Sequence, residues 1–275
     1  DATDSSNVET IEGASTTPAP GLEADPGQPS QPAQEWTPPV QIAKIPADSP
    51  APAVSPGNMR VAIIVDDGGY GGDVTERILA LDRGLTLSIL PYTPFGAETA
   101  RRARELGFEV MLHMPMENMD SELRHEGQLE VGMSAATIGA LTLKALDEIP
   151  GAAGVNNHMG SKFTADPLYM GFFADAIKGQ ELYFVDSRTT AESSAYDAAV
   201  SAGISAGYRH IFLDHDNTPE TIESQFRSMM TMAEEKGAVI AIAHFRPNTV
   251  ETLERLLPEL ASAGIELVHA SELMP

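Results

Sequence analysis

Short aliphatic runs recur along the chain from Met59 onward, and each has the length of a strand. Runs of this kind, bounded by turn residues, are typical of strands buried on both faces of a sheet. The predicted strands are Val61–Val65, Leu85–Leu90, Phe108–Leu112, Ala152–Val155, Leu182–Val185, His210–Leu213, Ala238–Ile242 and Ile265–Val268.

Helical patterns separate these runs, with capping residues before them and glycine after them. The expected helices run from Asp73 toward Leu81, from Glu98 to Leu106 before Gly107, from Ser134 to Ile149, and from Thr218-Pro219 to Gly237. Strands that alternate with helices indicate a parallel α/β fold. The region is short for a complete barrel of roughly 250 residues, so we expect an irregular or incomplete (β/α) barrel, with an open doubly wound sheet as the second choice.

Residues 1–58 have a different composition. They hold 11 of the 20 prolines of the chain, and eight acidic residues against one lysine. A segment with so few large apolar groups cannot offset the entropy lost on ordering, so we predict an extended, disordered, acidic linker. The predicted organisation is a linker over 1–58 followed by one barrel domain over 59–275.

Composition excludes several classes of protein. The chain has no cysteine, so disulfide scaffolds and cysteine-ligated metal sites are excluded. Its 17 Lys and Arg against 40 Asp and Glu give a net charge of -23, which argues against a nucleic-acid surface. No apolar run approaches the roughly 20 residues of a membrane span, but the chain begins at Asp1 rather than Met, so we expect that an upstream signal or anchor segment has been removed.

Polar residues follow six of the predicted strands. They are Asp66-Asp67, His113, Asn156-Asn157-His158, Asp186, Asp214-His215-Asp216 and His244. The carboxyl ends of parallel strands meet at one rim, where ligands bind in both candidate folds. The recurrence therefore predicts a single site.

The residue types indicate a metal. Asp66 and Asp67 are adjacent after an apolar strand and repel each other unless a cation lies between them. His113, His158 and His244 follow three different strands, and imidazole with carboxylate is a usual ligand set for catalytic zinc. Other polar residues have simpler interpretations: Asp214 and Asp216 fit helix capping equally well, His125, His210 and His269 are interpreted as surface or packing residues, and His215 stays open.

These segments resemble a known family. The motifs are Ile-Val-Asp66-Asp67-Gly-Gly, Leu-His113-Met-Pro-Met-Glu117, Gly-Val-Asn156-Asn157-His158-Met-Gly-Ser, Phe-Val-Asp186-Ser-Arg188-Thr, Phe-Leu-Asp214-His215-Asp216 and Ile-Ala-His244. Together they resemble the divergent polysaccharide deacetylases of bacterial envelopes. The resemblance implies an irregular (β/α) barrel and removal of N- or O-acetyl groups from a glycan.

The resemblance also implies roles for single residues. Asp66 corresponds to the catalytic base, Asp67 to a metal ligand and His244 to the general acid. The usual metal-binding His-x-x-x-His is replaced by His113 followed four residues later by Glu117, so His158 is expected to supply the second imidazole. Substrate-binding or supporting roles are expected for Glu117, Asn157, Asp186, Arg188 and His215.

The resulting hypothesis is a zinc-dependent or other divalent-metal hydrolase that acts on an acetylated polysaccharide or a peptidoglycan-type glycan. The expected location is the periplasm or cell envelope, and an envelope protein is a possible partner. The missing second histidine of the usual motif leaves open a binding protein without activity. A glycosidase that uses two carboxylates, Asp66 or Asp67 with Glu117 or Asp186, is the third alternative.

Overall fold

Nine parallel strands form one curved sheet in the computed structural model, which describes residues 59–119 and 124–275. Their spatial order is β6-β5-β4-β3-β2-β1-β8-β7, and β9 pairs with the beginning of β1. The strands are Met59–Gly68 (β1), Thr86–Ile89 (β2), Glu109–Met116 (β3), Gly154–Met159 (β4), Tyr183–Asp186 (β5), Ala206–Tyr208 (β6), Ile211–Phe212 (β7), Ala238–His244 (β8) and Ile265–Leu267 (β9). The predicted linker over 1–58 lies outside the described residues.

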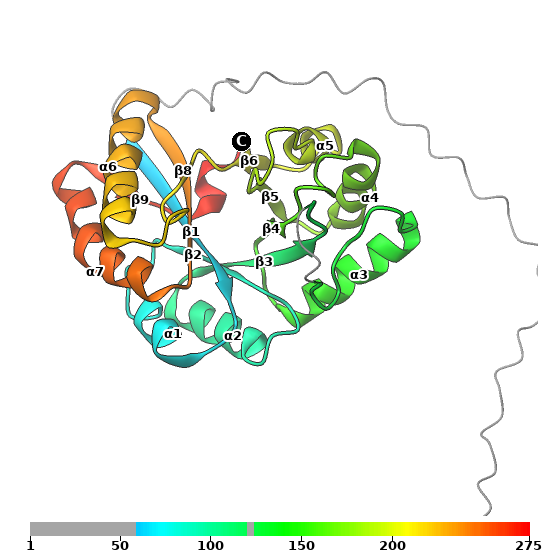
Figure 1. Cartoon of the computed structure of the whole chain (residues 1–275), viewed down its shortest axis with the longest axis horizontal. Coiled ribbons are helices and arrows are strands. Elements are labelled where there is room, and N and C mark those ends of the chain that lie inside the picture. The colour runs from blue at the N-terminus through cyan, green and yellow to red at the C-terminus, as the bar shows by residue number, and fades with distance from the viewer. Residues whose placement is uncertain (1–58, 120–123) are drawn as a thin grey trace, which may run out of the picture. The chain divides into compact units, whose positions relative to one another are not determined.

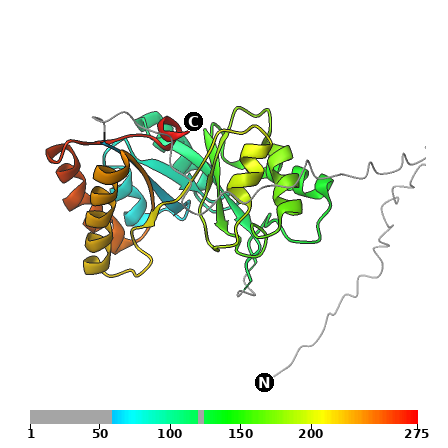
Figure 2. The same ribbon diagram turned by 90° about the horizontal axis from the view of Figure 1, so that it is seen from above.

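Helices surround the curved sheet on its outer side (Figure 1). They are Gly72–Ile78 (α1), Gly96–Leu106 (α2), Ala135–Glu148 (α3), Pro167–Ile177 (α4), Ala195–Ser201 (α5), Pro219–Lys236 (α6), Pro247–Ser262 (α7) and the 3-10 helix Ala270–Leu273 (η1). Figure 2 shows the orange and red C-terminal helices on one side of the strands and the green helices on the other. Within the described residues no pairing joins β6 to β7, so the barrel is incomplete, as predicted.

Side-chain alternation along β1 builds two cores. Val61, Ile63 and Val65 belong to the large core beneath the helices, whereas Ala62 and Ile64 belong to a smaller core inside the curved sheet. All five are fully buried, as expected for a parallel strand covered on both faces. None of the helices formed by the described residues has both the length and the apolarity needed to cross a membrane.

The predicted helix ends are largely confirmed. The side chains of Ser134 and Thr218 accept hydrogen bonds from backbone N–H groups in the first turns of α3 and α6. Gly107 and Gly237 end α2 and α6 in the left-handed conformation, which glycine adopts without steric cost. Asp73 is different: it lies in the first turn of α1, and the N-cap is Gly71.

All eight predicted strands are present with helices between them, but the structure contains a ninth strand, β6, that the sequence did not predict. β6 and β7 follow each other without a helix between them. β6 is three residues long and contains Gly207 but no aliphatic run, so its sequence carries no strand signal. Of the predicted strand His210–Leu213, only Ile211–Phe212 pairs as a strand.

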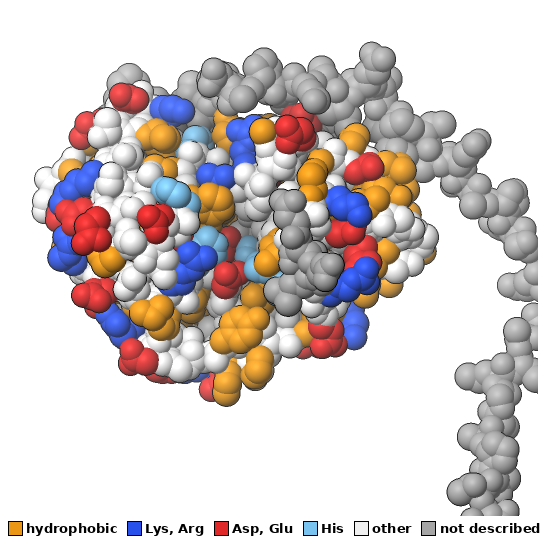
Figure 3. All heavy atoms as spheres, in the orientation of Figure 1, with side chains coloured by type: hydrophobic (Ala, Val, Ile, Leu, Met, Phe, Trp, Pro, Cys, Tyr) orange, Lys and Arg blue, Asp and Glu red, His pale blue; other side chains and the backbone are white. Residues whose placement is uncertain are grey.

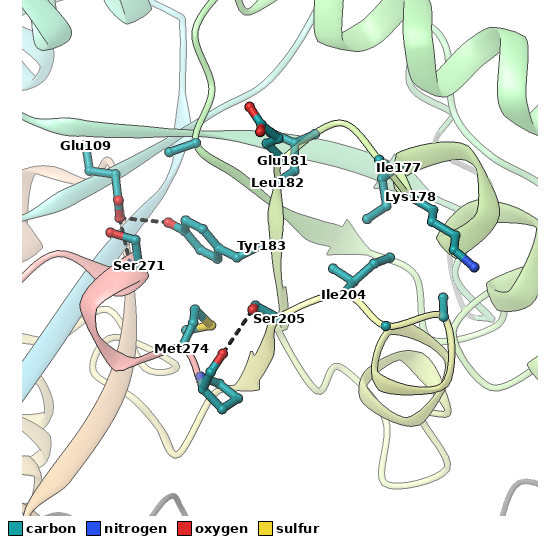
Figure 4. Close-up of a pocket in the computed structure, with 15 residues that line it drawn as sticks. Glu109, Ile177, Lys178, Glu181, Leu182, Tyr183, Ile204, Ser205, Ser271 and Met274 are labelled. Carbon is teal, nitrogen blue, oxygen red and sulfur yellow. Dashed lines mark hydrogen bonds between the residues drawn. The ribbon is translucent and has the colours of Figure 1, made fainter.

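A pocket of about 800 Å³ lies at the amino ends of β3 and β5, away from the predicted site (Figure 4). Glu109 lies at its edge, and Oε1 of Glu109 accepts hydrogen bonds from the Tyr183 hydroxyl at 2.7 Å, the Thr86 hydroxyl at 3.0 Å and the Ser271 N–H at 3.1 Å. One carboxylate oxygen thus joins β2, β3, β5 and η1. These contacts indicate that Glu109 has a structural role at this end of the barrel.

We expect Glu109→Leu to lower the free energy of unfolding by about 2–3 kcal/mol, because the partly buried donors of Tyr183 and Ser271 lose their acceptor. Glu109→Gln keeps an acceptor oxygen and is expected to lose less than about 1 kcal/mol. Urea denaturation of both variants is the measurement. Equal losses for the two variants would contradict the structural role of the acceptor.

Candidate functional site

The carboxyl ends of β1, β3, β4 and β8 bring polar side chains together inside the curved sheet. Strand parity places Asp66, His113, His158 and His244 there, since each continues a row that faces the inner core. The register between β1 and β8 sets Asp66 beside His244. Figure 3 shows histidine and acidic side chains in a hollow on this face, with basic side chains near its border.

β1 contains an extra residue at Asp66-Asp67. Its register against β2 shifts between Val65 and Gly68, which marks a bulge, and Asp67 has a φ of 68°. A left-handed φ is unfavourable for a residue other than glycine and typically marks a functional constraint. The bulge turns the carboxylates of two consecutive residues toward one site, whereas a regular strand would place them on opposite faces.

Three atoms from three strands converge beside the bulge. Oδ1 of Asp67 lies 3.3 Å from Nε2 of His113 and 3.0 Å from Nδ1 of His158. The two ring nitrogens are 3.1 Å apart. These residues form a group whose ligand atoms all lie within 4.8 Å of one another. The three predicted metal ligands therefore lie together.

Asn156 determines which nitrogen of His113 carries a proton. Oδ1 of Asn156 accepts from the Ser88 hydroxyl at 2.6 Å, and Nδ1 of His113 lies 2.7 Å from the same oxygen. Nδ2 of Asn156 donates to Oδ1 of Asp66 at 2.8 Å. Because Nδ1 of His113 faces an acceptor, it carries the proton, and the lone pair of neutral His113 is on Nε2, directed toward Asp67.

The convergent atoms fit a cation. Oδ1 of Asp67 is buried and accepts no hydrogen bond from the described residues. Burial alone would raise the pKa of Asp67, but His113 and His158 outweigh burial and hold this pKa well below its usual value. Carboxylate and imidazole lone pairs at this spacing are suited to a divalent metal such as zinc.

Protons would compete with a metal for these ligands. Burial lowers the pKa of His113, but the carboxylates of Asp66 and Asp67 outweigh it and raise this pKa above its usual value. Burial lowers the pKa of His158, and the neighbouring His113 lowers it further. A site that raises the pKa of a buried histidine attracts positive charge, and metal binding at such a site releases protons.

Asp66 lies beside the three ligands. It is 2% exposed, and its Oδ2 lies 3.7 Å from Nε2 of His113. Burial raises the pKa of Asp66, while His113 and His244 act in the opposite direction without cancelling it. A carboxylate with a raised pKa binds a proton more readily than an ordinary one, as general-base chemistry requires.

Asp214 holds His244. From the sequence alone, Asp214 fits a helix-capping role equally well. Nδ1 of His244 lies 2.7 Å from Oδ1 of Asp214, and Oδ2 accepts from the His244 N–H and the Thr249 hydroxyl. Burial lowers the pKa of His244, but Asp214 outweighs burial and raises it. This pair orients the other ring nitrogen, Nε2, as a proton donor.

His125, interpreted from the sequence as a surface or packing residue, packs against the candidate metal site. Its Nε2 lies 3.3 Å from Nε2 of His158, and the rings meet edge to face. When His158 offers the lone pair of Nδ1 to a metal, its Nε2–H donates to His125, and a partner of this kind fixes the orientation of a metal-bound imidazole. No sequence signal identifies His125, because it lies in the connection between β3 and α3 rather than at a strand end.

Two predicted residues support loops rather than join the metal ligands. Glu117 accepts from Nζ of Lys162 at 2.7 Å and from the Val131 N–H at 2.9 Å, so both of its oxygens have donors. Asn157 accepts from the Ser187 N–H and donates to the Met159 carbonyl.

The other three predicted residues lie in the connections that follow β5 and β7 or at the end of β5. The Asp186 carboxylate accepts hydrogen bonds from the Arg188 N–H and the Ser193 hydroxyl, and burial raises its pKa. The guanidinium of Arg188 lies over the ring of Tyr208. His215 is exposed in the connection between β7 and α6.

Comparisons with known proteins give a consistent result. Residues 63–274 match the model of a family described as divergent polysaccharide deacetylase. An uncharacterized protein of Haemophilus influenzae is 36% identical over 203 residues, which are 73% of this chain and 72% of that protein. The uncharacterized protein YibQ of Escherichia coli is 34% identical over 215 residues, which are 78% of this chain and 67% of YibQ.

Two solved structures have a similar fold. An uncharacterized protein of Agrobacterium tumefaciens has a TM-score of 0.76 at 22% identity, over 82% of this chain and 92% of that one. The catalytic domain of a peptidoglycan N-acetylglucosamine deacetylase from Eubacterium rectale has a TM-score of 0.53 at 14% identity, over 83% and 95% of the two chains. At these identities the likeness is one of fold.

We expect the wild-type protein to bind one zinc ion and Asp67→Asn to weaken the binding more than about 100-fold. Loss of a residue that only supports a ligand costs about 10–100-fold, and Asp67 would be a ligand itself. Glu117→Gln, at the same rim but outside the three convergent residues, is the matched control and should bind as the wild type does. Titration calorimetry with zinc measures both, and equal affinities for the two variants would rule out the assignment.

Proposed function

The chain belongs to the divergent polysaccharide deacetylase family, and from this premise we propose that it hydrolyses acetyl groups on a polysaccharide or peptidoglycan-type glycan of the bacterial envelope with a bound divalent metal. The main support for the proposal is that Asp67, His113 and His158 converge at one point. The buried carboxylate of Asp66 lies beside them, and the same rim holds His244, which is bonded to Asp214. Such a set provides a metal site, a base and an acid at one rim.

Asp67, His113 and His158 would hold the metal, with zinc as the expected ion. A bound divalent metal polarises an acetyl carbonyl and lowers the pKa of water. Asp66 takes the proton of the attacking water, which its raised pKa favours. Asn156 holds Asp66 and His113 through one amide, so it positions the base and a metal ligand relative to each other.

His244 donates the proton that the leaving amine or alkoxide needs. Asp214 keeps the ring in the orientation that leaves Nε2 for this transfer. Because Asp214 also raises the pKa of His244, more of the imidazole stays protonated at neutral pH than at its ordinary pKa. Asp214 is a positioning residue in this proposal, since it acts through His244.

The contacts of the remaining carboxylates argue against the glycosidase alternative. Both oxygens of Glu117 have donors, and Asp186 follows Phe184 in strand parity, with its oxygens bonded to its own loop. A pair of accessible carboxylates on either side of a glycosidic bond is needed for that chemistry. The replacement of the second histidine by Glu117 favoured a binding protein, but His158 occupies the position of the missing ligand in this proposal.

Zinc-loaded protein is expected to release acetate from acetylated peptidoglycan strands or chitin-type oligomers and to lose the activity after chelation. Asp66→Asn should lower kcat by about 10²–10⁴ and still bind zinc, with Glu117→Gln as the control. Acetate quantification with elemental analysis of the same samples is the measurement. Folded, zinc-containing protein that binds acetylated glycan without releasing acetate would favour the binding protein instead.

The pH profile of the reaction should depend on Asp214. A general acid works only while protonated, so the alkaline limb of kcat/KM reports the pKa of His244. Asp214 raises this pKa, and Asp214→Asn removes the negative charge responsible, so the alkaline limb is expected to move to lower pH. A limb that stays in place in the folded variant would show that His244 is not the acid.

A further inference from the structure

Two arginines at the rim of the hollow differ in their surroundings from the surface arginines. Arg188 follows β5, and its guanidinium lies 4.6 Å from the centre of the Tyr208 ring. Arg209 lies between β6 and β7, 3.6 Å above the ring of Phe212. Both guanidinium groups rest on aromatic faces, which hold them in place.

Neither arginine forms an ion pair with a carboxylate in the part of the chain that the structure describes. Surface arginines such as Arg77, Arg102 and Arg255 each contact a glutamate at 2.7–2.8 Å. Arg209 donates from Nε to the Ser187 carbonyl and from Nη2 to the Arg188 carbonyl, and both acceptors are neutral. Arg60, Arg83 and Arg104 also donate to backbone carbonyls. Arg188 and Arg209 are distinguished by their place just beyond the carboxyl ends of β5 and β6, at the rim that carries the candidate site.

The nearby carboxylate of Asp186 acts on both arginines without forming an ion pair with either guanidinium. Its oxygens accept from the Arg188 N–H, the Ser193 hydroxyl and the Tyr196 N–H, which organises the loop after β5. Burial lowers the pKa of Arg209 to about 10, Asp186 raises it and the neighbouring Arg188 lowers it. Asp66 also raises this pKa, and with a pKa of about 10 the guanidinium of Arg209 stays charged at neutral pH.

The position of Arg209 relates it to the proposed chemistry. Phe212, beneath Arg209, stacks on the ring of His244 with centroids 5.8 Å apart and planes at 21°. Arg209 and His244 therefore both pack against the ring of Phe212. His244 faces the leaving group in the proposed reaction, which is the sugar.

We propose that Arg188 and Arg209 bind a carboxylate carried by the sugar that loses its acetyl group, or by the sugar next to it. The inference rests on the proposed function and narrows its substrate to a carboxylated glycan. Guanidinium groups recognise planar carboxylates through paired, charge-assisted hydrogen bonds. A lactyl ether of a muramyl-type amino sugar and the carboxylate of a neighbouring uronic acid share this chemistry.

The test compares substrates with and without a free carboxylate. Wild-type protein is assayed for acetate release on muramic-acid-containing glycan strands and on the same strands after methyl esterification of their carboxylates. A uronic-acid-containing acetylated oligomer and a neutral chitin-type oligomer are the other two substrates. We expect the free carboxylate to be preferred over its ester by about 10–100-fold in kcat/KM, as for one or two charge-assisted hydrogen bonds. Comparing the muramic-acid and uronic-acid substrates shows which of the two carboxylates the site binds.

Arg188→Gln and Arg209→Gln should each abolish most of this preference, and Arg188→Lys should restore part of it. The control is Arg101→Gln on α2, whose side chain pairs with Glu105 on the surface and which should keep the full preference. Arg209 also supports a loop, so Arg188→Gln carries the test if the Arg209 variant does not fold. A preference that is absent in the wild type, or unchanged in folded Arg188→Gln, would overturn the proposal.

Binding measurements separate this proposal from the proposed function. Calorimetry of the free and esterified strands with metal-free protein reports the carboxylate contact without turnover. Acetate release from no substrate, together with charge-dependent binding that Arg188→Gln removes, would refute the hydrolase and support the carboxylate site. Acetate release without charge dependence in either measurement would support the hydrolase and refute the carboxylate site.

Discussion

The extra residue in β1 is the constraint on which the candidate site depends. A regular parallel strand alternates its side chains, so one of two consecutive aspartates would face the helices and remain a buried, unpaired charge at considerable cost. The bulge and the left-handed Asp67 turn both carboxylates to the inside. Gly69 makes the following turn possible, because its φ is 121° and a Cβ there would lie 2.2 Å from the Thr93 hydroxyl.

A single amide then holds Asp66 in place and determines the protonation of His113. Asn156 donates to Asp66 and accepts at the other end from His113 and Ser88, so its two ends cannot be exchanged without breaking all three contacts. The donor end keeps Asp66 in place, and the acceptor end assigns the proton of His113 to Nδ1. The inner face of β2 contributes only Ser88 to the site, and its hydroxyl completes this assignment.

The parts of the site that obey strand parity could be predicted from the sequence, and the parts that depend on loops could not. Asp66, His113, His158 and His244 all follow apolar runs, and parallel strands bring such residues to one rim. His125 reaches His158 from a long connection, whose path no periodicity describes. Asp214 occupied a strand end too, but an aspartate before a helix has two equally good explanations until its partner is seen.

The same division applies to the fold. Long aliphatic runs and glycine stops identified most strands and helices, because burial on both faces and left-handed C-caps leave little freedom of sequence. β6 was not predicted, because three residues at the edge of a sheet need no aliphatic run to pair on one side. Phe212 and Arg209 lie at this irregular edge, so the residues that we infer to select the substrate come from the region that sequence patterns describe least well.

The surface charge and the charges at the rim act on a carboxylated substrate at different distances. The net charge of -23 repels a carboxylated polymer at long range, but at physiological salt charges on the surface are largely screened beyond about 8 Å. Asp66 and Asp67 lie inside, where histidines offset them and the proposed divalent cation would do so further, and the arginines lie at the border, resting on aromatic rings. A carboxylate that has come within contact distance therefore meets these guanidinium groups, while the acidic surface that it passed contributes little.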